Sequence, residues 1–125
     1  MSRLDERGLP EGAVLREHLE IAPREVDRRR RAGEALRIVD CRSELERAIA
    51  TLADTEHVPM ERVVEWIDDL RDDPDDRPIV VHCHHGIRSL QVVALLHEAG
   101  FGNARSMAGG IHLWSQAVDS SVATY

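Results

Sequence analysis

The chain has 125 residues, a formal net charge of −7 and a composition that is 42% hydrophobic and 31% charged. This length fits one domain with its own core, and the composition is ordinary for a globular protein. The negative charge and the aromatic content of 3% argue against a nucleic-acid partner, which needs a positive field and stacking side chains.

The sequence also argues against a membrane partner and against secretion. The apolar runs are shorter than a membrane span, and the amino terminus lacks the charged-then-apolar layout of a secretory signal. The two cysteines, Cys41 and Cys83, are too few for a disulfide framework. We therefore expect a cytoplasmic protein with free thiols.

The first half of the chain predicts a leader followed by short strands and helices. Residues 1–16 contain two glycines and a proline, which favour turns, so we expect a flexible N-terminal leader before one domain over residues 17–125. Pro23 suits the first turn of a helix. Residues 43–53 show helical spacing of apolar side chains, but the assignment stays open. The expected elements are a strand at 18–21, a helix at 23–32, and strands at 36–40 and 56–58.

The second half predicts further alternation of helices and strands. Apolar residues at helical spacing predict an amphipathic helix over 60–70. The run from Leu90 to Ala99 is apolar nearly all round, so we expect a buried helix there. Strands at 79–81 and 103–106 and a short helix after Gly109-Gly110 complete the pattern. Strands alternating with helices predict an α/β domain whose parallel sheet is covered on both faces.

The loop after the strand at 79–81 is the candidate site. Cys83 stands at the carboxyl end of that strand, which is where open parallel sheets bind ligands. If the following residues curl around the sulfur, their amides form an anion-binding concavity at a helix start, and this favours the thiolate. Gly86 permits the curl, and Arg88 can bind an oxyanion or hold the thiolate. The neighbouring His84 and His85 can add charge near neutral pH.

Each cysteine also has a plain structural interpretation, because free cysteines are common core residues. For Cys83, the nearby glycine, arginine and helix start favour a nucleophile over packing. Cys41 is favoured as a small core filler. A resolving thiol for Cys83 is the alternative if the strands of the two cysteines are neighbours.

Six short motifs occur in a fixed order along the chain. They are IAP at 21–23, IVDCR at 38–42, HVP at 57–59, CHHGIRS at 83–89, GFGNA at 100–104 and MAGGIHLW at 107–114. Each is weak alone, but in this order and spacing they resemble the rhodanese-like family over about residues 17–120. The departures are Ala22 in place of serine or threonine, Cys41 in place of valine, and no clear glycine before His57.

The resemblance implies a rhodanese-like three-layer α/β fold, in which helices cover both faces of a five-stranded parallel sheet. It implies a sulfurtransferase in which Cys83 takes a sulfane sulfur from thiosulfate or a persulfide and passes it to a thiol or cyanide. Asp40 and Arg42 are then supporting residues with a mainly structural role. A sulfur-relay protein is a compatible partner, and no cofactor or metal is implied. The persulfide would lie among the amides of the loop residues His84, His85, Gly86, Ile87, Arg88 and Ser89.

Three other functions compete with sulfur transfer. A cysteine-dependent phosphatase or arsenate reductase of the rhodanese-related type has five residues between cysteine and arginine, whereas four lie between Cys83 and Arg88. A rhodanese module that only binds a partner usually lacks the cysteine or an intact loop. The third alternative is metal binding. It is disfavoured because the consecutive residues 82–85 could not all converge on one ion. The remaining histidines are expected to be dispersed, namely His18, His57, His97 and His112.

Overall fold

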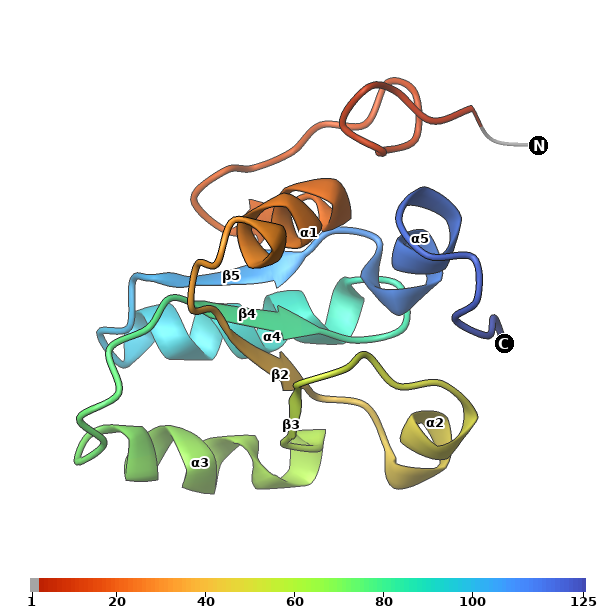
Figure 1. Ribbon diagram of the computed structural model, residues 1–125. Coiled ribbons are helices and arrows are strands. Elements are labelled where there is room, and N and C mark those ends of the chain that lie inside the picture. The colour runs from red at the N-terminus through yellow and green to blue at the C-terminus, as the bar shows by residue number, and fades with distance from the viewer. Residues whose placement is uncertain (1–2) are drawn as a thin grey trace.

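The computed structural model describes residues 3–125, which form a five-stranded parallel sheet with helices around it (Figure 1). The strands are β1 (Glu20–Ile21), β2 (Arg37–Asp40), β3 (Glu56–His57), β4 (Ile79–His82) and β5 (Ala104–Met107). Their order across the sheet is β1-β5-β4-β2-β3, and every neighbouring pair is parallel. The strand β4 therefore lies in the middle of the sheet.

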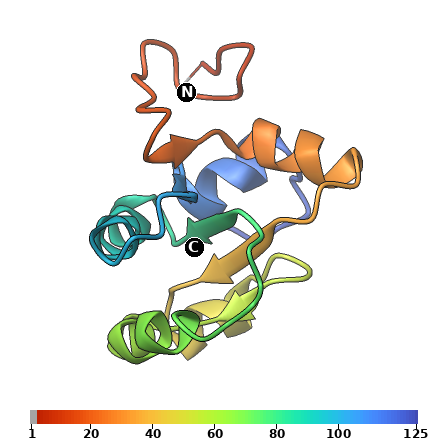
Figure 2. The ribbon, with the colours of Figure 1, turned by 90° about the vertical axis from the view of Figure 1, so that its left-hand side faces the viewer.

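The helices cover the two faces of this sheet, as expected from the alternation in the sequence. They are α1 (Pro23–Arg31), α2 (Glu44–Ile49), α3 (Val63–Leu70), α4 (Ile87–Glu98) and α5 (Gly110–Ala117). Ile38 and Val80 pack with α1 and α5, whereas Val39 and Val81 pack with α3 and α4. Alternate strand residues thus fill two separate cores, and Figure 2 shows α3 on the opposite side of the strands from α1 and α5.

The structure settles one open assignment and corrects another. Residues 43–53 contain α2, whose start is fixed by a capping box in which Ser43 and Glu46 exchange hydrogen bonds. The helix expected to be buried, α4, begins earlier, at Ile87, and buries one face only. Ile87 is 70% exposed and Leu95 is 40% exposed, because α4 covers the sheet from one side and its outer face meets solvent.

Smaller differences concern element boundaries. The strand expected at 18–21 is reduced to β1, since only residues 20 and 21 pair with β5. The helix expected over 60–70 starts as a 3-10 turn, Met60–Arg62, before α3. In both cases the type of element is as predicted and its end is shifted by a few residues.

The segment before β1 folds back on the domain. Leu9 is buried and packs with Ala22, Ala108 and Leu113, and Leu4 pairs with Pro10 in an isolated bridge. The division into a flexible leader over 1–16 and one domain over 17–125 stays a prediction, and its first two residues lie outside the described part of the chain. Within residues 3–125, no helix has the length and apolar character needed to cross a membrane.

The first turn of α5 lies directly against the loop that follows β4. The Ile111 N–H donates to the Cys83 carbonyl oxygen at 2.9 Å, and the His112 N–H donates to that of His84 at 3.1 Å. Gly110 has a φ of +63°, and a Cβ there would lie 2.5 Å from the Cys83 carbonyl oxygen. This close approach requires glycine, so Gly110 fixes where α5 docks.

We expect Gly110→Ala to destabilise the fold more than a glycine replacement that is strained but unobstructed. Gly100 is the matched control, because its φ is +96° and nothing lies within 4 Å of its Cβ position. Both variants place an alanine in the left-handed backbone region, which costs about 1–2 kcal/mol. Gly110→Ala should lose about 1–3 kcal/mol more through overpacking, measured as the free energy of unfolding in urea. Equal losses in the two variants would contradict the docking role of Gly110.

Candidate active site

Cys83 lies at the carboxyl end of β4, and the following loop turns its donors toward the sulfur. The Gly86 N–H donates to Cys83 Sγ at 3.1 Å and the Ser89 N–H donates at 3.4 Å. The Ser89 Oγ lies 3.3 Å from the same sulfur. Because the loop closes over the sulfur, Cys83 is only 1% exposed. The expected concavity is present, with two of the loop amides reaching the sulfur itself.

The shape of this loop depends on Gly86, as the sequence predicted. Gly86 is the N-cap of α4 with a φ of +95°, in the left-handed region that side chains rarely adopt. A Cβ at this position would also lie 3.0 Å from the Gly109 nitrogen. The next residue, Ile87, points into solvent and contributes only its backbone to the loop. Glycine here therefore permits both the turn and its contact with the segment before α5.

A second hydroxyl supports the Ser89 side chain from β5. The Ser89 and Ser106 Oγ atoms lie 2.7 Å apart, and both residues are fully buried. If Ser106 donates to Ser89, the Ser89 hydroxyl is free to donate to the Cys83 sulfur. Ser106 was not among the predicted site residues, since a serine in a strand carries no signal until the strand order is known.

Cys41, favoured by the sequence as a core filler, lies beside Cys83, because the strands of the two cysteines are neighbours. It follows β2 as Cys83 follows β4, and the two strands pair Asp40 with His82. The Cys41 N–H continues the ladder by donating to the His82 carbonyl oxygen at 3.1 Å. Both cysteines belong to the core cluster on the α3–α4 face of the sheet. Cys41 is buried, as a core filler should be, and its thiol is coupled electrostatically to that of Cys83.

These neighbours make the Cys83 thiol strongly acidic. A hydrogen bond from the Cys41 thiol, together with the hydroxyl and N–H of Ser89 and the N–H of Gly86, lowers the pKa of Cys83 to about 4. Burial acts in the opposite direction and is outweighed. The thiolate of Cys83 and burial raise the pKa of Cys41, which therefore stays a thiol and acts as the donor. Cys83 carries the negative charge of the pair.

Arg88 does not contact the sulfur, which differs from one of the expected roles. Its guanidinium donates to both carboxylate oxygens of Glu46, at 2.7 and 2.8 Å. Glu46 lies in α2, and this ion pair lowers the pKa of its carboxyl well below the usual range. The Tyr125 hydroxyl donates to the same carboxylate at 2.7 Å. The cation expected to meet an oxyanion is thus held by an acidic side chain beside the loop.

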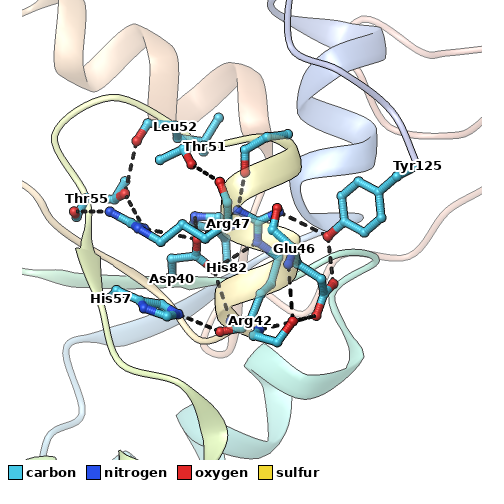
Figure 3. A network of polar contacts seen from close by, with 12 residues as sticks. Asp40, Arg42, Glu46, Arg47, Thr51, Leu52, Thr55, His57, His82 and Tyr125 are labelled. Atoms are coloured by element: carbon cyan, nitrogen blue, oxygen red, sulfur yellow. Dashed lines mark hydrogen bonds and ion pairs between the residues drawn. The ribbon is translucent and has the colours of Figure 1, made fainter.

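Asp40 and Arg42 form a buried ion pair at the end of β2 (Figure 3). Arg42 donates to Asp40 through Nε at 2.9 Å and Nη2 at 2.8 Å, and both residues have no exposed surface. Arg42 also donates to the Ala50 carbonyl oxygen at 2.6 Å, and Arg47 donates to Asp40 at 3.1 Å. These contacts join β2 to α2, which carries Glu46. The proposed role of Asp40 and Arg42 remains a structural one.

Three histidines gather beside the loop, which corrects the expectation that His112 is dispersed. The ring centroids of His84 and His85 lie 3.9 Å apart, and that of His112 lies 5.0 Å from His85 and 6.0 Å from His84. Tyr125 stacks on His84 at 3.9 Å. Burial, followed by the nearby His85, lowers the pKa of His84, so this ring carries little charge at neutral pH.

Comparisons with known proteins agree with this fold. The sequence model of the rhodanese-like domain matches residues 22–117. A thiosulfate sulfurtransferase, GlpE, of Pseudomonas paraeruginosa is 30% identical over 106 residues, which cover 83% of this chain and 90% of that protein. The maize protein named adenylyltransferase and sulfurtransferase MOCS3-2 is 30% identical over 116 residues, which cover 90% of this chain and 24% of that protein.

Solved structures give the same result. The human single-domain sulfurtransferase TSTD1 superposes with a TM-score of 0.63 and 26% identity, over 78% of this chain and 95% of that one. The chain spans about a quarter of the length of the first curated relatives it matches. With residues 22–117 matched, the chain belongs to the rhodanese-like domain family.

Proposed function

We propose that this protein is a sulfurtransferase that carries a sulfane sulfur on Cys83. The observation that carries the proposal is the convergence of the Gly86 and Ser89 N–H groups on the Cys83 sulfur. Relatives named thiosulfate sulfurtransferase support the same kind of reaction. Thiosulfate or a persulfide is the proposed donor, and a thiol or cyanide the proposed acceptor.

The proposed reaction has two steps, each a nucleophilic attack on sulfur. The Cys83 thiolate attacks the outer sulfur of thiosulfate, so that a new S–S bond forms, the S–S bond of thiosulfate breaks, and sulfite leaves with the electron pair. Cyanide or a thiolate then attacks the outer sulfur of the Cys83 persulfide and restores the Cys83 thiolate. The negative charge passes from Cys83 to the outer sulfur and back, so the exchange needs no outside oxidant or reductant.

The loop contributes fixed hydrogen-bond donors that stabilise the negative charge on sulfur. The amides and hydroxyl around Cys83 are held by α4 and by Ser106, so they need no reorientation when the charge moves. The four-residue spacing to Arg88 gives a short loop that suits one sulfur better than a phosphoryl group, which supports sulfur transfer over the phosphatase alternative. We further propose a cytoplasmic location and a sulfur-relay protein as partner, in keeping with the sulfurtransferases MOCS3-2 and MoeZ among its relatives.

Replacing the nucleophile should abolish sulfur transfer. We expect Cys83→Ser to lose thiosulfate:cyanide turnover and to gain no sulfur atom after thiosulfate treatment, whereas Cys41→Ser still gains one. Mass spectrometry of the Cys83 peptide and the turnover assay measure the two effects. The proposal fails if Cys83→Ser keeps its turnover. Hydrolysis of p-nitrophenyl phosphate by the wild type, without added sulfur on Cys83, would favour the phosphatase.

Removing the thiol next to Cys83 should make the nucleophile less acidic. Cys41→Val removes the hydrogen bond that contributes most to lowering the pKa of Cys83. We therefore expect this pKa to rise above its value of about 4. The thiolate is present above this pKa and is lost as the pH falls through it. The pH profile of alkylation by iodoacetamide should therefore move to higher pH. Cys41→Ser is the control, because its hydroxyl can still donate. A Cys41→Val profile that matches the wild type would show that Cys41 only packs.

The ion pair between Arg88 and Glu46 should control how well the protein binds negatively charged sulfur donors such as thiosulfate. We expect Arg88→Ala to raise the KM for thiosulfate about tenfold, the loss of about 1.4 kcal/mol for a charge-assisted contact, and to change the KM for a neutral organic polysulfide much less. Glu46→Gln, which releases Arg88 from its carboxylate, should lower the KM for thiosulfate. Equal changes for both donors would tell against charge recognition by Arg88.

A further inference from the structure

The histidine cluster beside the catalytic loop has the composition of a metal site. His84 and His85 come from the loop after β4, and His112 comes from the first turns of α5. One ring nitrogen from each of the three lies within 4.8 Å of the other two. His112 is far from the other two in the sequence, and the docking of α5 on the loop brings it to them.

Two nitrogens of this cluster are buried without a partner. His84 Nε2 and His112 Nδ1 have almost no accessible surface, and neither has a hydrogen-bond partner among residues 3–125. Leaving a buried polar nitrogen unpaired is unfavourable, so such an atom points to an unseen partner. A metal ion that accepts ring lone pairs is a partner of this kind.

The surroundings hold the rings in place. The His112 N–H donates to the His84 carbonyl oxygen at 3.1 Å, which fixes the two backbones relative to each other. The ring of Tyr125 stacks on that of His84 with an interplanar angle of 10°. The Gln116 amide nitrogen Nε2 lies 3.4 Å from His112 Nε2. A flip of this amide would turn its oxygen to the ring, where it would accept the Nε2–H and leave Nδ1 as a ligand.

We propose that His84, His85 and His112 bind a divalent d-block cation, with Zn²⁺ as the representative ion. Three neutral imidazoles suit Zn²⁺, Cu²⁺ or Ni²⁺, whereas Mg²⁺ and Ca²⁺ require oxygen ligands. Zn–N bonds of about 2.0–2.1 Å place tetrahedral ligand atoms about 3.3 Å apart. The cluster must therefore contract from its separation of up to 4.8 Å, and the exposed ring of His85 has the freedom to move inward.

Three protein ligands leave a fourth coordination position open. The ion would lie at the loop that carries Cys83, because His84 and His85 belong to that loop. It would add two positive charges next to the loop that carries the sulfur anion. The binding of the ion does not depend on the proposed sulfur transfer, so binding and catalysis can be tested apart.

Isothermal titration calorimetry with ZnCl₂ on the reduced, metal-free protein tests the site. We expect one Zn²⁺ per chain in the wild type and in the Cys83→Ser variant. His85→Asn and His112→Asn should each weaken binding at least about tenfold. The matched control His18→Asn, which replaces an exposed histidine, should bind as the wild type does. His85 is exposed, so its variant keeps the test valid even if His112→Asn fails to fold.

Two outcomes would overturn the proposal. One is Zn²⁺ affinity that is unchanged in both His85→Asn and His112→Asn. The other is binding that disappears in Cys83→Ser, which would assign the ion to the thiolate. Absorption spectra with Co²⁺ give an independent readout, since we expect tetrahedral bands without sulfur-to-cobalt charge transfer. Thiosulfate:cyanide turnover without metal is measured on the same samples, so a failure of the metal site is distinguishable from a failure of the proposed function.

Discussion

The structure depends on one constraint, which is that the backbone after β4 must close around the sulfur of Cys83 while α4 begins. Two amide N–H groups and a hydroxyl surround a buried sulfur, and a buried anion is tolerated only where such donors replace water. The rest of the site serves this closure. Gly86 permits the turn, Gly110 lets α5 approach it, and the Ser106 hydroxyl supports Ser89 from the neighbouring strand.

Ion pairs around the loop hold α2 in position and set the charge beside the loop. The pair of Asp40 and Arg42 has no exposed surface, and the Arg42 guanidinium has its remaining hydrogen bonds satisfied by carbonyl oxygens and by Tyr125. A buried pair of this kind is costly to break, since either partner alone would be an uncompensated charge. It holds α2 in position, and α2 carries the Glu46 that binds Arg88. The charge beside the loop is therefore set by residues more than 40 positions away in the chain.

The sequence predicted the fold and pointed to the loop after β4 as the candidate site, and its failures have identifiable causes. The alternation of apolar strands with helical patterns is local information, so β2, β4, α3 and α4 were predicted with the correct type. Cys83 and Gly86 were predicted because a strand end, a glycine and a helix start are adjacent in the chain. The contacts of Ser106 and His112 with the site were missed, and the place of Cys41 beside Cys83 was only an alternative that required neighbouring strands. Each depends on strand order or helix docking, which no local pattern encodes.

The order of the strands has a consequence for how the site moves. The strand that leads into Cys83 pairs with β2 on one side and β5 on the other, so its amides are tied into ladders on both flanks. Opening such a strand requires disrupting most of the sheet, and in most proteins the innermost strands open only when the whole domain unfolds. The Cys83 sulfur attached there shares that rigidity. Local opening would be confined to the outer strands, which leaves the sulfur in a fixed place.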